Sequence, residues 1–315
     1  MRPLFNATLS ALSLSLLAGC TPSTVEKDPC DTANCGQDST PTVQNAEPRS
    51  LVAIGYNDAE GVNELYSINV ETAEVTTLLS FEFDSGSWWP GIVSDTENGV
   101  LYCVSMNNTL YRIAMDGSSI EAMGELSKSI QNMGMGTDQL IGIGYKEISE
   151  KNVLRSIDPA TGEVSDILDF TFESGSWELN VTPNVDAGEF YVSDTDHNLY
   201  RIKMDGSAVD VIGQYGPHVF FARGQEGLAG IVYNEDTERY EVVNLSTETG
   251  QITVLNDFTF NTSDWNGYVV ADPDAGVFYG LSNTQTLYRF HMDDGEKEKI
   301  GRLSQGIQVM GLGPL

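Results

Sequence analysis

Three tryptophans recur at a nearly constant spacing and are the residues best suited to bind a ligand. Trp88, Trp177 and Trp265 lie 89 and 88 residues apart, and each follows a short stretch rich in hydroxyl-bearing, acidic and glycine residues. Aromatic rings beside hydroxyls and carboxylates are typical of the rim of a ligand site. A recurring tryptophan can equally be a wedge that packs between repeated units. Trp89 has no counterpart in the other two copies and is expected to be the more exposed of its pair.

Other polar residues give weaker indications of chemistry. Three arginines each follow a tyrosine at the same repeat position, and they could form a ring of anion ligands. The interpretation we favour is structural: each arginine pairs with the aspartate of the Met-Asp-Gly turn that follows it. These arginines are Arg112, Arg201 and Arg289. No catalytic triad, His-x-x-x-His pair or glycine-rich phosphate loop accompanies the three histidines, which are His197, His218 and His291.

The chain is strongly acidic. It has 46 Asp and Glu residues against 16 Lys and Arg residues, which gives a formal net charge of −30. Such a surface repels nucleic acid and anionic lipid head groups, so a polyanionic partner is not expected. The alternating carboxylates of an EF-hand loop are absent, and we interpret the acidity as a solvated surface. No cofactor and no metal site are expected.

The first 19 residues are expected to be a signal peptide. Arg2 precedes an apolar run, residues 9–17, which is too short to span a bilayer. The Leu-Ala-Gly-Cys sequence ending at Cys20 resembles the lipobox of bacterial lipoproteins. That resemblance implies cleavage before Cys20 and lipid attachment to its thiol, which would anchor a domain without crossing the membrane. Thr21 stands where an aspartate would signal inner-membrane retention, so the resemblance favours the outer membrane.

Residues 20–49 are expected to comprise the lipidated cysteine and a disordered tether. Residues 21–49 contain four prolines and no large aromatic residue, a composition that cannot bury enough apolar surface to fold. In an exported chain, the neighbouring Cys30 and Cys35 favour a small disulfide loop over a metal site, which would need more ligands. Cys103 lies in an apolar strand pattern and is expected to be a buried, inert thiol.

The rest of the chain, residues 50–315, consists of six repeats. An apolar residue at one repeat position recurs at intervals of 45, 44, 45, 43 and 45 residues. The six positions are Ile68, Ile113, Ile157, Ile202, Leu245 and Phe290. Each repeat contains four short runs rich in Val, Ile, Tyr and Phe, and turn residues separate them, as in antiparallel meanders. Helical periodicity is missing after the signal peptide.

Two kinds of repeat alternate along the chain. One kind ends its third strand in a DPATG-like turn, and the other ends it in Met-Asp-Gly. In the fourth repeat the expected strands are 177–182, 189–193, 198–204 and 208–213. Four strands in about 44 residues, repeated six times, predict the blades of a β-propeller.

The two ends of the repeat region predict how a ring would close. Residues 50–56 match a second strand, and residues 307–313 match a first strand that no further repeat follows. The last strand is therefore expected to complete the blade begun by the first residues, with Met310 beside Ala53. Such closure would remove two exposed strand edges, each of which is an aggregation hazard.

The segments NLYRIKMDGS and TLYRIAMDGS resemble the third strand and turn of repeats in YWTD-type and TolB-type six-bladed β-propellers. The segment RSIDPATGEV is similar to the equivalent part of quinoprotein-like and surface-layer propeller repeats. The resemblance implies an all-β, six-bladed propeller of four-stranded antiparallel blades over residues 50–315. It implies little about activity, because propellers host many unrelated functions.

The function expected from these features is non-enzymatic binding. We predict a monomeric, lipid-anchored propeller of the cell envelope whose partner is a protein, a glycan or another small molecule. Its binding face would carry Trp88, Trp89, Trp177 and Trp265. The alternative is an enzyme, because some six-bladed propellers are metal-dependent lactonases with polar ligands on their first strands. The matching polar residues here would be Asn132, Glu178 and Asn180.

Overall fold

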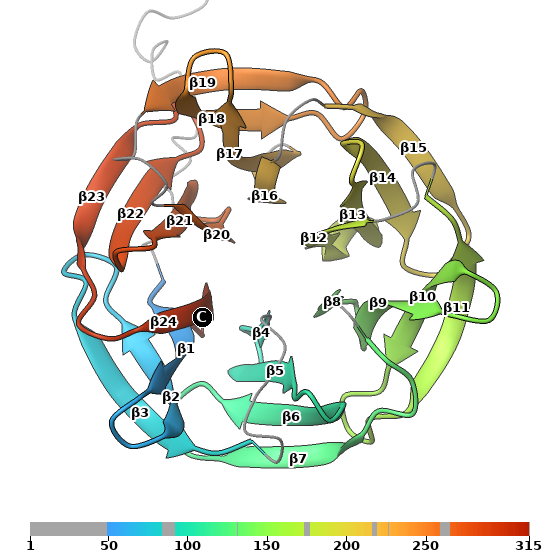
Figure 1. Cartoon of the computed structure of the whole chain (residues 1–315), viewed down its shortest axis with the longest axis horizontal. Coiled ribbons are helices and arrows are strands. Elements are labelled where there is room, and N and C mark those ends of the chain that lie inside the picture. Colours follow the sequence, from blue (N-terminus) through green and yellow to red (C-terminus); the bar gives the residue numbers. More distant parts are fainter. Residues whose placement is uncertain are drawn as a thin grey trace, which may run out of the picture. The chain divides into compact units, whose positions relative to one another are not determined.

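Six four-stranded antiparallel sheets, or blades, make up the part of the chain that the computed structural model describes (Figure 1). That part comprises residues 49–83, 92–130, 132–172, 177–215, 219–225, 227–258 and 265–314, with 177–180, 219–220 and 265–268 described by backbone alone. Within these ranges there is no α-helix, and one short 3-10 turn, η1 (Val185–Ala187), follows a strand. The predicted all-β, six-bladed fold is therefore confirmed.

Each blade places its first strand near the middle of the ring and its fourth strand on the outside (Figure 1). From the inside outwards, blade 1 consists of β24 (Ile307–Leu312), β1 (Leu51–Asn57), β2 (Val62–Ile68) and β3 (Val75–Phe81), and blade 2 of β4 (Val93–Asp95), β5 (Val100–Val104), β6 (Thr109–Ala114) and β7 (Ile120–Glu125). Blade 3 consists of β8 (Asn132–Met135), β9 (Leu140–Lys146), β10 (Lys151–Ile157) and β11 (Val164–Phe170), and blade 4 of β12 (Trp177–Asn184), β13 (Glu189–Asp194), β14 (Asn198–Lys203) and β15 (Val209–Gln214). Blade 5 consists of β16 (Val219–Arg223), β17 (Leu228–Asn234), β18 (Arg239–Leu245) and β19 (Ile252–Phe258), and blade 6 of β20 (Trp265–Asp272), β21 (Val277–Ser282), β22 (Thr286–His291) and β23 (Lys297–Arg302).

The repeat positions read from the sequence are structurally equivalent. The six recurring apolar residues all lie in the third strand of a blade, and each is at most 1% exposed. In blade 4, the four strands lie where the spacing predicted them, although β12 extends to Asn184, two residues beyond the expected end. The regular spacing of the apolar residues therefore corresponds to one buried third-strand position in each blade.

The turn between β10 and β11 shows why a DPATG-like sequence recurs after third strands. The Asp158 carboxylate accepts a hydrogen bond from the backbone N–H of Ala160 (2.7 Å), which holds the start of the turn. Gly162 then takes a left-handed φ of 71°, which glycine adopts without steric cost. The local sequence therefore favours this hairpin independently of the packing between blades.

Apolar side chains pack on both sides of every blade. In the described residues, each pair of neighbouring blades encloses one of six hydrophobic clusters. Between blades 6 and 1, for example, Tyr66 and Ile68 pack with Tyr279 and Leu281. Cys103 is fully buried between blades 1 and 2, and that burial raises the pKa of its thiol. The prediction of a buried, inert thiol is therefore confirmed.

The C-terminal strand closes the ring as predicted. β24 pairs antiparallel with β1, and Met310 lies opposite Ala53. Beside this pair, the backbone N–H of Arg49 donates to Asp272 Oδ2 (3.2 Å), and the Arg49 guanidinium pairs with Asp274. Asp272 ends β20, the first strand of blade 6, and Asp274 lies in the turn that follows, so the first described residue also ties blade 1 to blade 6.

Several predicted features lie outside the described residues. These are the signal peptide, the lipid-attachment residue Cys20, and the proposed pair Cys30 and Cys35. Among the residues that are described, no helix has the length and apolar character needed to span a membrane.

Removing residues 307–315 is expected to unfold or polymerise the protein. The deletion would leave β1 with an unpaired edge and open the cluster between blades 6 and 1. Size-exclusion chromatography and thermal unfolding followed by circular dichroism would measure the effect. Removing residues 314–315 alone leaves β24 intact and serves as the control. A shortened chain that stays monomeric and melts like the intact protein would contradict this role of β24.

Candidate functional site

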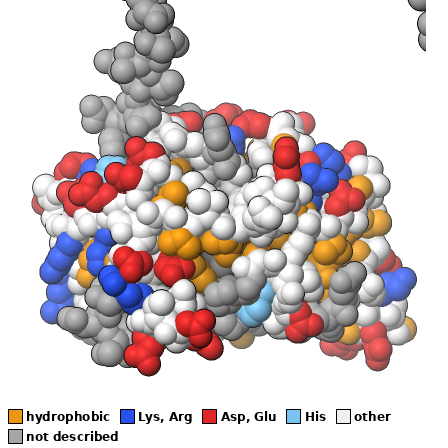
Figure 2. Space-filling model, turned by 90° about the horizontal axis from the view of Figure 1, so that it is seen from above, with side chains coloured by type: hydrophobic (Ala, Val, Ile, Leu, Met, Phe, Trp, Pro, Cys, Tyr) orange, Lys and Arg blue, Asp and Glu red, His pale blue; other side chains and the backbone are white. Residues whose placement is uncertain are grey.

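The antiparallel order of the strands gives the ring two distinct faces. The connections between consecutive blades and the hairpins from second to third strands emerge on one face, which we term the crossover face. The remaining hairpins lie on the other face, where Gly313 N donates to Ser50 O (2.8 Å); we term this the closure face. In side view, acidic side chains gather along the upper and lower rims of the ring, with hydrophobic side chains visible between them (Figure 2).

The predicted tryptophan sites fall only partly within the described residues. Trp88 and Trp89 lie outside them. Trp177 and Trp265 are the first residues of β12 and β20, at the same register relative to the second strand of their blades. Both therefore begin an innermost strand on the crossover face, as the repeat predicted. The part that the four tryptophans play in binding stays a prediction.

Three tyrosines on the crossover face form a feature that the sequence reasoning missed. Tyr56, Tyr145 and Tyr233 occupy the same position near the ends of β1, β9 and β17, and they are 38%, 39% and 38% exposed. Their blades, 1, 3 and 5, alternate with the blades that carry the tryptophans. A sequence pattern could have revealed them: in each case a tyrosine directly precedes an Asn or Lys at the end of an apolar run.

Each of these tyrosines lies on the side of its sheet that faces the following blade. Side chains alternate along a strand, so Tyr56 points to the same side as Val52 and Ile54. Those two residues pack in the cluster between blades 1 and 2. The tyrosine ring consequently extends the buried row of its strand onto the open face.

Two other apolar side chains are exposed on the same face. Met106 lies in the hairpin between β5 and β6, and Ile148 lies in the hairpin between β9 and β10. The described part of the chain exposes seven large hydrophobic side chains, and five of them are on the crossover face. The other two, Val211 and Val254, are on the outer strands β15 and β19.

The recurring arginines form cross-strand ion pairs, so the expected pairing with the Met-Asp-Gly turns was wrong. Each arginine lies directly opposite a carboxylate of the neighbouring fourth strand, and that register brings the charges together. The pairs are Arg112–Glu121 (3.5 Å), Arg201–Asp210 (3.0 Å) and Arg289–Glu298 (3.7 Å), and Arg289 also contacts Glu71 of blade 1 (2.6 Å). The turn aspartates instead accept hydrogen bonds from their own turns, for example Asp205 from Ser207 N (2.9 Å). The arginines therefore do form ion pairs within the fold, as the structural interpretation expected, but their partners are different carboxylates.

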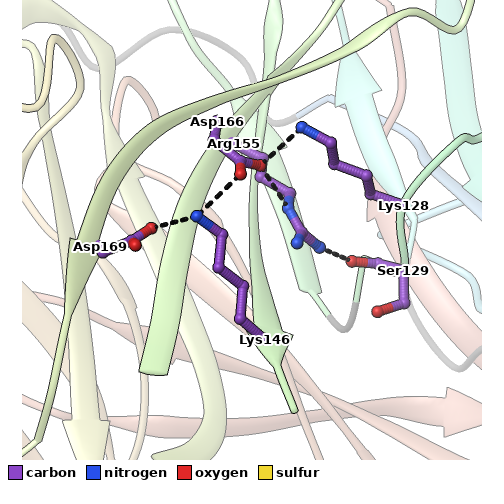
Figure 3. A network of polar contacts seen from close by, with 6 residues as sticks. All are labelled: Lys128, Ser129, Lys146, Arg155, Asp166 and Asp169. Atoms are coloured by element: carbon purple, nitrogen blue, oxygen red, sulfur yellow. Dashed lines mark hydrogen bonds and ion pairs between the residues drawn. The ribbon is translucent and has the colours of Figure 1, made fainter. Parts of the chain in front are cut away.

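Asp166 in β11 is the centre of a charged network in blade 3, and Arg155 in β10 links it to the preceding connection (Figure 3). The Nε of Arg155 donates to Asp166 Oδ1 (3.0 Å), and its guanidinium also donates to the carbonyl of Ser129 in the connection from blade 2. Lys128 and Lys146 each contact the Asp166 carboxylate at 2.9 Å. Burial acts to raise the pKa of Asp166, but the hydrogen bonds from both lysines and Arg155 outweigh it and hold the pKa well below its usual range. The network therefore fastens the incoming connection to blade 3.

Buried carboxylates in the described residues also have structural partners. Each of the four accepts at least one hydrogen bond within its own region of the fold. They are Glu64 (from Tyr66 Oη, 2.6 Å), Glu189 (from Tyr191 Oη, 2.6 Å), Asp194 (from Tyr200 Oη, 2.8 Å) and Asp272 (from Ala275 N, 3.3 Å). Burial acts to raise the pKa of Glu189, but hydrogen bonds from Lys203 and Tyr191 outweigh it and lower the pKa. The four buried carboxylates therefore serve to position neighbouring tyrosines and turns.

The residues named for the enzyme alternative fall only partly within the described structure. Asn132 begins β8, and the side chains of Glu178 and Asn180 in β12 lie outside the description. Within the described ranges, no group of three or more His, Cys, Asp or Glu side chains is arranged to hold a metal ion.

The histidines occupy unrelated environments. His197 adopts a left-handed φ of 63° in the turn before β14, and its ring centroid lies 5.9 Å from that of Tyr215. His291 ends β22 in another blade, and His218 lies outside the described residues. The turn position of His197 matches Asn108 and Gln285, which have φ values of 65° and 60°. His197 therefore occupies a turn position that two other blades share and that is defined by its left-handed backbone conformation.

A polar groove opens on the closure face between blades 3 and 4. Its volume is about 590 Å³. One wall is the hairpin between β8 and β9, and the other is the turn between β14 and β15 with the end of η1. The side chains that line it are those of Thr137, Asp138, Gln139, Ile141, Ala187, Lys203, Met204, Asp205 and Ser207.

Comparison with known proteins identifies the fold. No protein-family model and no curated protein matches this sequence. Among solved structures, TolB from Acinetobacter baumannii matches with a TM-score of 0.60 and 12% identity, over 85% of this chain and 67% of that chain. A putative TolB from Agrobacterium tumefaciens matches with a TM-score of 0.56 and 12% identity, over 84% and 94%. An oligogalacturonate lyase in complex with manganese matches with a TM-score of 0.50 and 14% identity, over 80% and 78%.

The fold is that of TolB-like six-bladed β-propellers. At these identities the likeness concerns the fold alone, and proteins with this fold include both TolB and a lyase.

Replacing Arg155 with alanine is expected to destabilise the protein by about 2 kcal/mol, because the buried Arg155 side chain loses its packing and its hydrogen bonds to Asp166 and to the carbonyl of Ser129. Arg112→Ala is the matched control: its ion pair is exposed, so the expected cost is below about 1 kcal/mol. Urea unfolding at neutral pH would compare the two variants. Equal losses of unfolding free energy would contradict an anchoring role for Arg155.

Proposed function

We propose that this protein is a lipid-anchored binding module of the cell envelope, attached to the outer membrane and acting without enzymatic chemistry. In this role residues 1–19 direct export, Cys20 carries the lipid and residues 20–49 form the tether. The propeller acts as a monomer and uses no cofactor. Its partner is a protein that docks on the crossover face, which the four tryptophans are predicted to share.

The alternating arrangement of exposed aromatic side chains on the crossover face carries this proposal. Half-exposed tyrosines recur in blades 1, 3 and 5 on the end of the ring where Trp177 and Trp265 begin the inner strands of blades 4 and 6. Tyrosine and tryptophan contribute large contact areas at small entropic cost, and they are enriched where protein interfaces are strongest. Rigid strand ends support these rings, so little ordering is needed on binding.

Carboxylates flank Tyr56 and Tyr233 and favour a partner with a basic surface, whereas the hairpin after Tyr145 carries both signs of charge. The hairpin after Tyr56 carries Asp58 and Glu60, and the hairpin after Tyr233 carries Glu235, Asp236 and Glu238. A polar, charged rim around an aromatic centre is the usual composition of a transient protein interface. Opposite charge on the partner would accelerate association, and added salt would weaken it.

The position of the tether junction is compatible with docking on the crossover face. The described chain begins at Arg49, which contacts Asp272 and Asp274 on the closure face. The proposed docking face is therefore at the end of the ring opposite to the point where the tether joins. A partner can approach that face without displacing the junction.

The alternative function is a metal-dependent hydrolase or lactonase with its site in the central channel. One protein with a similar fold is a lyase in complex with manganese, which is the observation that keeps this alternative open. Elemental analysis of the purified protein would separate the two hypotheses. One tightly held divalent ion per chain, lost on Asn132→Ala, would favour the enzyme.

Replacing all three tyrosines with serine is expected to reduce partner binding by at least about tenfold, because the aromatic anchors are lost. The partner would be captured from envelope extract on the immobilised protein, identified, and titrated against each variant. The double variant Val211→Ser/Val254→Ser removes exposed apolar side chains elsewhere and should bind normally. Thermal unfolding would confirm that both variants fold. Unchanged affinity of the Tyr56, Tyr145 and Tyr233 variant would refute docking on this face.

Cys20→Ser is expected to move the protein from the outer-membrane fraction to the soluble fraction, because the acyl-bearing thiol is lost. Cell fractionation and labelling with a radioactive fatty acid would measure the effect. Cys30→Ser should leave both the label and the location unchanged. Fatty-acid label retained on the Cys20→Ser variant would contradict the lipoprotein prediction.

A further inference from the structure

The groove between blades 3 and 4 lies on the closure face, away from the proposed docking surface. We propose that it is a second binding site, specific for a neutral carbohydrate of about two sugar rings. This inference is independent of the proposed function, because it concerns the opposite face of the ring and a different class of ligand.

The groove walls present hydrogen-bonding groups from two blades. Thr137, Asp138 and Gln139 project from the hairpin between β8 and β9, and Asp205 and Ser207 come from the turn between β14 and β15. Carboxylate, amide and hydroxyl groups can each accept from or donate to the hydroxyls of a sugar. The Asp205 carboxylate is oriented by the Ser207 N–H (2.9 Å), so its wall is held in place before a ligand arrives.

The charge in the groove disfavours an anionic ligand. Lys203 is the only cation among the residues that line it, and its Nζ lies 2.5 Å from Glu189 Oε1. That pair is close to neutral, so Asp138 and Asp205 leave the groove with net negative charge. A phosphate or a uronic acid would be repelled, whereas neutral hydroxyl groups can donate hydrogen bonds to the carboxylates.

The size of the groove suits a small ligand. Ile141 and Met204 lie at its base but are 1% and 7% exposed, so the polar side chains of the walls would make the contacts to a sugar. The volume of about 590 Å³ lies within the usual range for small-molecule sites. Gly188 also lines the groove, and a Cβ atom built there would have no neighbour within 4 Å. The space above this glycine is therefore open to a ligand.

Lys203 departs from the repeat, whereas Met204, Asp205 and Ser207 match Met115, Asp116 and Ser118 of blade 2. The position of Lys203 is taken by Ala114 in blade 2 and by His291 in blade 6, and the position of Glu189 is taken by Val100 and Val277. The fold thus forms the same turns without this ion pair. The Lys203–Glu189 pair occurs in one of the three equivalent places, and it leaves the two aspartates as the uncompensated charges of this groove.

The test uses the full-length protein and defined probes. Cellobiose, maltose and N,N′-diacetylchitobiose represent neutral disaccharides, trigalacturonate represents an anion, and spermidine represents a cation. Saturation-transfer NMR and isothermal titration calorimetry would measure binding. At least one neutral disaccharide is expected to bind, and trigalacturonate and spermidine are expected to bind at least about tenfold more weakly.

Two glycines in equivalent turns provide a matched pair of variants. Gly188 and Gly99 have φ values of 62° and 64°, and neither has an atom within 4 Å of a Cβ built on it. Asparagine tolerates this conformation, so both variants should fold. Gly188→Asn places a side chain in the groove and is expected to weaken disaccharide binding at least about tenfold, whereas Gly99→Asn should not. Asp138 is exposed and lies outside the turn of Gly188. Asp138→Ala is expected to weaken disaccharide binding by a similar factor.

Three results would overturn the proposal. They are binding of none of the disaccharides, preferential binding of trigalacturonate or spermidine, and equal weakening by Gly188→Asn and Gly99→Asn. Loss of partner capture by the tyrosine variant with disaccharide binding intact would support both proposals separately, since the two sites lie on opposite faces.

Discussion

The antiparallel pairing of β24 with β1 is the constraint on which the rest of the fold depends. In the described structure, the other strand pairs join neighbours in sequence, so short connections set their register. The pairing of β24 with β1 joins opposite ends of the chain and converts a row of blades into a ring. Ring closure brings blades 6 and 1 together around their shared hydrophobic cluster, and the contacts of Arg49 with blade 6 reinforce the same junction.

The two faces of the closed ring carry different kinds of surface. Alternating blades repeat the same hairpins, so a residue type that belongs to the repeat recurs on the same face around the ring, whereas Met106 and Ile148 are each exposed in a single hairpin. The exposed tyrosines follow this rule, and they produce a face with several similar anchors. The groove between blades 3 and 4 breaks the rule, because Lys203 and Glu189 occur in one of the three equivalent places. A repeated fold thus supports a broad surface on one side and a local, specialised site on the other.

The fold was predictable because the repeat interval and the mismatched ends of the chain are properties of the sequence itself. The partners of the arginines were not, since Arg201 meets Asp210 through cross-strand register, whereas chain proximity had pointed to Asp205. The exposure of Tyr56 could not be predicted from the sequence either. The alternation of side chains along β1 puts Tyr56 on the same side as the buried Val52 and Ile54, which predicts burial. Only the arrangement of the blades shows that β1 ends on an open face. The groove requires two blades to be placed side by side, which no single segment reveals.

The place of β1 in its sheet has a mechanical consequence. β1 is hydrogen-bonded along both edges, to β2 and to β24, and the described chain begins two residues before it. If the protein is anchored through its N-terminal residues and pulled by a partner on the crossover face, as proposed, the load passes along the axis of β1. Extraction of this strand must then rupture both ladders together in shear, which resists force better than unzipping one bond at a time. Under the proposed function, the junction that completes the ring would also bear the tension between the anchored end of the chain and a docked partner.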